Sequence, residues 1–305
     1  MQSVGIDAEQ LAALRTDGAI RLKKPFDDMW LDRLRDGIER NILEPSPLFK
    51  GTIGDEDSRG YLFDMWTRQR IPEFDEFLRH SGIAELAAKC LGQPRARLML
   101  DAWFSKPAGT IERTPWHQDI GILGTYYSFW VALDPIPRSE SLELIRGSHL
   151  LDSCFMFEQY FNTDKGARTL REMEEACRDY QKRGAVHSDA AGRLRFLPMP
   201  DIEATRQDYD VLSWDMDEGD CIIFHGMMLH SSSGNPSRAD ARRFVSRWAE
   251  TSAVVGPHGD VLKGAVSRTG YDIPLTLGEP FTGQMFPVLP DQPASPESQR
   301  SGPAQ

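Results

Sequence analysis

Hydrophobic residues recur at helical spacing in the first ninety residues of the chain, in three segments: 7–18, 26–42 and 74–92. The first segment begins at Asp7, which can cap a helix, and ends at Gly18. The third is expected to break at Ser81–Gly82 and to end at Gly92. A short strand is expected at 19–24. This pattern predicts a helical N-terminal support over residues 1–93.

From Arg95 the pattern changes to short runs of apolar, aromatic and β-branched residues, separated by Gly, Pro, Asp or Ser. The runs are ARLMLDAWFSK (96–106), YYSFWVAL (126–133), LELI (142–145), YDVLSW (209–214), DCIIFHGMML (220–229) and RRFVSRWAE (242–250). Such runs predict an antiparallel β-barrel or sandwich core over 94–250. An insertion at 151–210, with a helix expected at 168–184, is long enough for a lid or a substrate-facing excursion.

Composition and charge narrow the class of protein. The 305 residues suit one domain over 1–285, and the Pro-, Ser- and Gln-rich segment 286–305 is expected to be disordered. A formal net charge of −11 at pH 7 argues against nucleic acid or an anionic membrane as a partner. We expect neither a signal peptide nor a membrane span. Four scattered cysteines without a CxxC pair predict reduced thiols and a cytoplasmic location.

Residues 116–120 read WHQDI and place His117 and Asp119 two positions apart. On a strand both side chains would point to one face, whereas Gln118 would point to the other. A histidine and a carboxylate on one face can take adjacent positions around a metal ion, but the pair alone carries little information. Iron(II) oxygenases bind the metal with two histidines and one carboxylate, so the site needs a second histidine from a distant strand.

Two histidines in the segment 219–235 (GDCIIFHGMMLHSSSGN) can supply the missing ligand. Five residues apart on a strand, His225 and His230 would face opposite sides. Small residues follow His230 and leave room for a crowded site, while His225 is interpreted as a strand-end or supporting residue. Arg242 and Arg243 come twelve and thirteen residues after His230, and a guanidinium can hold a carboxylate through two hydrogen bonds.

These motifs, in this order, resemble the phytanoyl-CoA dioxygenase-like branch of the Fe(II)/2-oxoglutarate oxygenases. The matching segments are WHQD (116–119), FWVALD (129–134), LELIRGSH (142–149), GDCIIFHGMMLHSSSGN (219–235) and RRFVSRW (242–248). The resemblance covers about residues 98–248. It implies a mainly β fold with flanking helices around a double-stranded β-helix, the jelly roll also seen in cupins.

The resemblance also implies a set of site residues. The metal ligands and catalytic residues it implies are His117, Asp119 and His230. Arg242 matches the arginine that pairs with the 2-oxoglutarate carboxylate, with Arg243 as the fallback because the alignment needs a one-residue gap. Trp130 matches an aromatic residue that lines the cosubstrate pocket. Related halogenases have Ala or Gly in place of Asp119, so this carboxylate favours hydroxylation or another oxidation.

Three further polar residues receive structural interpretations. His149, in the Gly-Ser-His turn, is expected to organise a loop beside the site. Lys106 lies at a strand end, where a lysine is more often solvated than turned into a pocket. Asp134 ends a strand and is expected to form a turn.

The function implied is an Fe(II)- and 2-oxoglutarate-dependent dioxygenase that hydroxylates an unactivated C–H bond of a small metabolite and releases succinate and CO2. Its cofactors would be Fe(II), 2-oxoglutarate and O2, and its partner a small-molecule substrate, with a homo-oligomer left open. The acidic chain disfavours a coenzyme A ester. Two alternatives remain: a cupin-type metalloenzyme without 2-oxoglutarate, and a non-catalytic jelly-roll binding protein. The substrate is not predicted.

Overall fold

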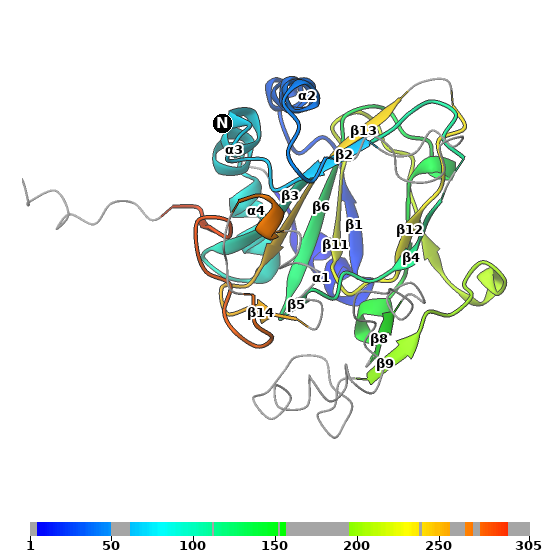
Figure 1. The fold of residues 1–305 in the computed structure, drawn as a ribbon. Coiled ribbons are helices and arrows are strands. Elements are labelled where there is room, and N and C mark those ends of the chain that lie inside the picture. The colour runs from blue at the N-terminus through cyan, green and yellow to red at the C-terminus, as the bar shows by residue number, and fades with distance from the viewer. Residues whose placement is uncertain are drawn as a thin grey trace, which may run out of the picture.

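Two antiparallel sheets face each other in the computed structural model (Figure 1). The residues it describes are 5–49, 62–111, 113–151, 153–156, 195–237, 240–256, 266–270 and 275–291. Among them, the strands of the larger sheet are, in order, β1 (Ala19–Leu22), β11 (Cys221–His225), β6 (Tyr126–Ala132), β13 (Ala241–Ala249), β3 (Ala96–Lys106) and β15 (Val288–Leu289), with β2 (Leu62–Met65) also paired to β3.

The smaller sheet carries the segments that the sequence singles out for metal binding. Its described strands are, in order, β10 (Val211–Leu212), β7 (Leu142–Ile145), β12 (His230–Ser232) and β4 (Thr114–His117). Two short pairs complete the strands: β14 (Val254–Val255) with β5 (Ile122–Leu123), and β8 (Ser153–Met156) with β9 (Arg195–Pro198). The two facing sheets form the predicted double-stranded β-helix, so the expected fold class is confirmed.

Side chains alternate along β13 between the two faces of the larger sheet. Phe244 and Trp248 are fully buried on the outer face, among the side chains of the helices. Arg243, Val245 and Arg247 face the space between the sheets. Because successive side chains of β13 point to opposite faces, this one strand both packs against the helical layer and lines the interior of the jelly roll.

Helices cover the outer face of the larger sheet (Figure 1). They are α1 (Ala8–Thr16), α2 (Asp28–Leu43), α3 (Pro72–His80) and α4 (Ile83–Leu91). Asp7 caps α1 by accepting a hydrogen bond from the Gln10 backbone N at 2.8 Å. Gly92, with φ +65°, ends α4 in the left-handed conformation that favours glycine. α3 ends at His80 and α4 begins at Ile83, so the two helices are separated at Ser81–Gly82.

The chain stays packed beyond residue 285, where the sequence predicted the start of a disordered tail. Val288 and Leu289 form β15 on the edge of the larger sheet, and Leu289 is buried. Residues 292–305 and the helix expected at 168–184 lie outside the described residues. At the end of the predicted insertion, Ile202 is buried beside the smaller sheet. In the part of the chain that the structure describes, no helix combines the length and the apolar character needed to cross a bilayer.

Phe77 joins the helical layer to the larger sheet, and its removal should lower the free energy of unfolding. Its side chain is fully buried, and its ring lies 5.0 Å from that of Phe26 and 5.5 Å from that of Phe244. We expect Phe77→Ala to cost about 3–5 kcal/mol in urea unfolding. The control Met29→Ala, at a side chain 61% exposed on α2, should stay within about 0.5 kcal/mol of the unmodified protein. Equal losses in both variants would contradict this packing.

Candidate active site

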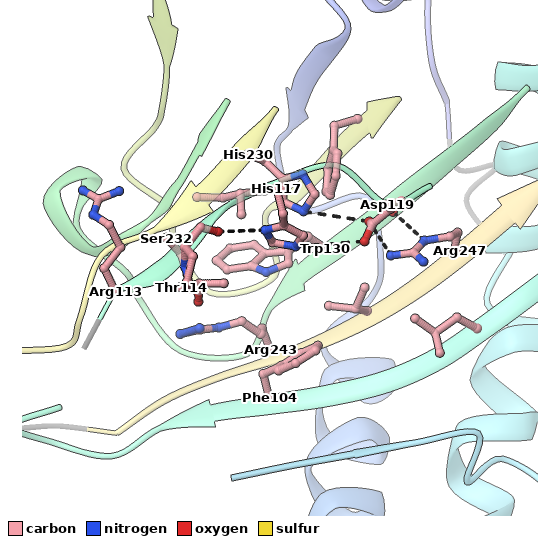
Figure 2. A pocket seen from close by; sticks show the side chains of 16 residues that line it. Phe104, Arg113, Thr114, His117, Asp119, Trp130, His230, Ser232, Arg243 and Arg247 are labelled. Atoms are coloured by element: carbon pink, nitrogen blue, oxygen red, sulfur yellow. Dashed lines mark hydrogen bonds and ion pairs between the residues drawn. The ribbon is translucent and has the colours of Figure 1, made fainter. Parts of the chain in front are cut away.

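Strand pairing brings two histidines from distant parts of the chain together. His117 ends β4 and lies opposite His230, the first residue of β12, and their ring centroids are 4.0 Å apart. Asp119 is the second residue after the end of β4. Its Oδ1 lies 4.0 Å from Nε2 of His117, and its Oδ2 lies 3.8 Å from Nε2 of His230 (Figure 2). The three ligand atoms that these residues offer lie within 4.8 Å of one another.

Backbone carbonyls orient both imidazole rings. Nδ1 of His117 lies 2.9 Å from the carbonyl oxygen of Pro115, and Nδ1 of His230 lies 2.9 Å from that of Met228. A carbonyl oxygen only accepts, so each Nδ1 donates, and in the neutral form of either ring the lone pair lies at Nε2. This is the arrangement that orients metal-binding histidines, so the donor set fits a divalent metal ion.

Charge and burial shift the pKa values of His230 and Asp119 in the directions that favour metal binding. Burial, reinforced by neighbouring His117, lowers the pKa of His230 to about 3, so its ring is neutral near pH 7. Burial alone would raise the pKa of Asp119, but Arg247 and the two histidines outweigh it and hold that pKa below its ordinary value. Two neutral imidazoles and one carboxylate are the donor set of non-haem iron(II) sites.

The backbone of Asp119 is fixed by its surroundings. Its N–H donates to the carbonyl of Gly226 at 3.2 Å, and its own carbonyl accepts a hydrogen bond from the Tyr126 hydroxyl. A Cβ at Gly226 would lie 1.7 Å from the Tyr126 ring, so glycine is needed for this close approach. The position of the carboxylate is therefore set by the packing between the strand ends.

A cavity of about 660 Å³ lies between the sheets beside this cluster. Its volume is in the range of small-molecule sites. Its apolar and aromatic lining includes Leu100, Phe104, Trp130, Leu142, Phe224 and Val245. Its polar lining includes Arg113, Thr114, Ser128, Ser232, Arg243 and Arg247, together with the three candidate ligands (Figure 2).

Arg243, and not Arg242, faces the cavity. The Arg243 guanidinium lies 5.1 Å from the centre of the Trp130 ring, and both side chains line the pocket. Arg242 points to the opposite face of β13, where Nε and Nη2 bind the carboxylate of Asp134 at 3.0 and 2.9 Å. This placement favours Arg243 over Arg242, the first choice from the sequence, because alternation along β13 turns the two neighbours to different faces. Asp134 serves as an ion-pair partner beside its strand end.

Lys106 lies behind the polar end of the cavity. Its side chain is fully buried, which contradicts the expected solvated position. Its Nζ donates to Oγ of Ser232 at 2.9 Å and to the carbonyl of Ser233. Oγ of Ser232 also lies 3.1 Å from Oγ1 of Thr114. Burial, with the charges of Arg243 and Arg113 next, lowers the pKa of Lys106 to about 6.

Arg247 is a site residue that the sequence reasoning missed. It lies four residues after Arg243 on the same face of β13, and its Nη2 donates to Oδ2 of Asp119. The two-residue alternation of side chains along a strand could have indicated Arg247, since any strand that turns Arg243 inward also turns Arg247 inward. At the other end of the cavity, Arg113 is paired with Glu143, Nη1 to Oε2, at 2.6 Å.

Other polar residues near the cluster have supporting positions. Gln118 points away from the metal ligands, as predicted, and donates to the carbonyl of Met227 at 2.7 Å. Nδ1 of His225 accepts from the Met227 backbone N at 3.1 Å, and His225 does not line the cavity. Nε2 of His149 lies 3.0 Å from the carbonyl of Arg15, so this ring ties the Gly-Ser-His turn to α1.

Comparisons with known proteins agree with this architecture. A search of curated protein sequences finds no match. The carbocyclase SnoK from nogalamycin biosynthesis, described as non-haem and α-ketoglutarate-dependent, has a similar structure: TM-score 0.67, 17% identity, 95% of this chain and 99% of that chain covered. The epimerase SnoN, solved with Fe3+, α-ketoglutarate and nogalamycin RO, is also similar. Its TM-score is 0.65 and its sequence identity is 19%, and the match covers 91% of this chain and 96% of that chain.

A third similar structure is EctD from S. alaskensis with 2-oxoglutarate and 5-hydroxyectoine, with TM-score 0.56, 18% identity, and 82% of this chain and 78% of that chain covered. At these identities the structures establish a shared fold. The sequence itself matches the family model described as phytanoyl-CoA dioxygenase (PhyH) over residues 14–244, which is more than half of the chain. The protein therefore belongs to the phytanoyl-CoA dioxygenase family.

Proposed function

We propose that this protein is a dioxygenase that hydroxylates an unactivated C–H bond of a small metabolite and converts 2-oxoglutarate to succinate and CO2. The family uses Fe(II), 2-oxoglutarate and O2 as cofactors. The observation that carries the proposal is the single cavity that joins the His117, Asp119 and His230 cluster to the inward-facing guanidinium of Arg243.

The polar side chains in and behind the cavity divide into metal-binding and cosubstrate-binding groups in this proposal. His117, Asp119 and His230 would hold the metal. When bound, Fe(II) supplies the centre at which O2 and the 2-oxo acid react. Arg243 and Ser232 would bind the distal carboxylate of 2-oxoglutarate, since a guanidinium and a hydroxyl are both donors at the polar end of the cavity. Lys106 would orient the Ser232 hydroxyl from behind.

The walls of the cavity favour a largely apolar substrate. Leu100, Phe104 and Val245 line it on the β3 and β13 side, and Trp130 and Phe224 line it on the β6 and β11 side. Such walls exclude water, which strengthens the electrostatic interactions inside the site and protects reactive species from side reactions. The charge of Arg113 is balanced by Glu143 and that of Arg247 by Asp119, which does not favour a multiply charged coenzyme A ester.

Hydroxylation is the proposed outcome, and the fold also supports other oxidations. SnoK and SnoN, with the same fold, are described as a carbocyclase and an epimerase. The inward-facing Arg243 supports a 2-oxoglutarate enzyme over a cupin-type metalloenzyme without this cosubstrate. The complete set of three metal donors supports an enzyme over a non-catalytic binding protein.

The proposed function is tested by loading the protein anaerobically with Fe(II) and 2-oxoglutarate and screening small metabolites for substrate-stimulated succinate release in air. A true substrate should release succinate in step with O2 uptake and give a product with one added oxygen atom. His117→Ala should abolish this activity, and the control His80→Ala, at an exposed residue, should keep it. A product without added oxygen would contradict hydroxylation, and O2 uptake without succinate would support the cupin-type alternative.

The opposite orientations of Arg242 and Arg243 predict opposite effects on 2-oxoglutarate binding. Arg243→Met removes a charged donor from the cavity and should weaken binding to the Mn(II)-loaded protein by about 10- to 100-fold, measured by calorimetry. Arg242→Met is the matched control on the same strand and should change the affinity by less than about threefold, because its partner Asp134 lies on the other face. The reverse order of effects would show that Arg242 is the carboxylate-binding residue.

The lowered pKa of Lys106 predicts that 2-oxoglutarate binding takes up protons. With a pKa of about 6 in the ligand-free protein, the amine is mostly neutral at about pH 7.5. A dianion bound nearby would raise this pKa, so affinity should increase as the pH falls from about 8 towards 6. The measurement is calorimetry in buffers of different ionisation enthalpy.

Lys106→Met should remove most of this proton uptake. Glu140 is the control, because it also faces Arg243 and Lys106, and burial raises its pKa. Glu140→Gln should preserve the uptake that comes from Lys106. Equal proton uptake in the unmodified protein and in Lys106→Met would refute the assignment to this lysine.

A further inference from the structure

One candidate metal ligand has a cationic partner that the proposed chemistry does not require. Nη2 of Arg247 donates to Oδ2 of Asp119, and the same guanidinium lines the cavity (Figure 2). Its Nε donates to Oγ of Ser128 at 3.2 Å. Asp119 thus has Oδ2 engaged by an arginine and 3.8 Å from Nε2 of His230, while its Oδ1 lies 4.0 Å from Nε2 of His117.

The position of Arg247 is set by the centre of the larger sheet. β13 lies between β6 and β3, and Arg247 is directly paired with Ser128 on one side and Leu100 on the other. Both neighbouring strands hold β13 in the sheet, and its register with β3 shifts between Arg247 and Trp248. Because Ser128 also binds the side chain, the guanidinium reaches Asp119 from a rigid base.

How a carboxylate binds a metal decides how many positions remain for other ligands. A carboxylate that binds through one oxygen uses one position, and one that binds through both oxygens uses two. A facial set of two histidines and one carboxylate leaves open positions for a chelating cosubstrate and for O2. A second oxygen of Asp119 on the metal would occupy one of them.

We infer that Arg247 is a positioning residue that holds Oδ2 of Asp119 and restricts this carboxylate to binding the metal through one oxygen. The backbone of Asp119 is already fixed by Gly226 and Tyr126, so rotation of the carboxylate is the main freedom left to the side chain. Arg247 removes that freedom. The inference rests on the proposed metal site. Arg247 is assigned neither as a metal ligand nor as a 2-oxoglutarate ligand, and it would act only through Asp119.

Replacing Arg247 should have a different effect on the bound metal than the loss of an ordinary structural contact. Loss of a structural contact would lower the amount of metal bound and leave the hydration of each bound ion unchanged. Loss of a residue that restricts the carboxylate would let both oxygens of Asp119 bind, and each bound ion would lose a water ligand. The hydration per bound ion separates the two roles, and neither 2-oxoglutarate nor turnover is needed to measure it.

The test uses Mn(II) alone, with the bound fraction taken from the electron paramagnetic resonance signal of unbound Mn(II). Hydration is taken from the enhancement of water-proton relaxation per bound ion. Arg247→Met should reduce this relaxation by roughly a third, as expected when one of about three open octahedral positions is lost. Arg247→Lys, which keeps a charged donor, should retain relaxation nearer to that of the unmodified protein. Arg242→Met, with the same change on the opposite face, should leave it unaltered.

Equal relaxation per bound ion in Arg247→Met and the unmodified protein would overturn the inference, even if Arg247→Met binds less metal. If Arg247→Met does not fold, Arg247→Gln carries the same prediction, because glutamine lacks the reach and charge to hold Oδ2. Unmodified protein that binds no Mn(II) would refute both this inference and the proposed function. Normal Mn(II) binding with unchanged hydration in the variants would refute the inference alone.

Discussion

The pairing of β4 with β12 is the constraint on which the site depends. His117 and His230 are 113 positions apart in the sequence, and only the antiparallel register places them opposite each other with ring centroids 4.0 Å apart. A slip of one residue along either strand would turn its side chains to the other face. The carbonyls of Pro115 and Met228, which orient the two rings, belong to the same strand ends and would move with them.

The larger sheet contributes two positively charged side chains, both from β13, to the site. Arg243 and Arg247 project from β13 towards opposite ends of the candidate metal cluster, and the flanking strands β6 and β3 hold that strand in place (Figure 2). Arg243 lies with Ser232 and Lys106 at the polar end, where a dicarboxylate can be bound, and Arg247 contacts Asp119. The helices stabilise this arrangement from outside, since Phe244 and Trp248 of the same strand are buried among them. Packing and chemistry therefore depend on one alternating strand.

The fold class could be predicted from the sequence. The motif WHQD and the distal His230 also pointed to the three residues that the structure brings together as a candidate metal site, and His225 does not join that cluster. The sequence did not show which of Arg242 and Arg243 faces the cavity, because both faces of β13 are largely buried and no apolar–polar alternation indicates its direction. The roles of Lys106 and Arg247 arise from contacts with Ser232 and Asp119 across the two sheets, which strand patterns in one sequence do not report.

The central claim is that one cavity holds Fe(II) and 2-oxoglutarate together. The most direct measurement is an anaerobic titration of the Fe(II)-loaded protein with 2-oxoglutarate, followed by the charge-transfer absorption that arises when the 2-oxo acid chelates the metal. We expect a saturable band with one cosubstrate and one iron per chain. Iron bound at this stoichiometry with no charge-transfer band at saturating 2-oxoglutarate would contradict it.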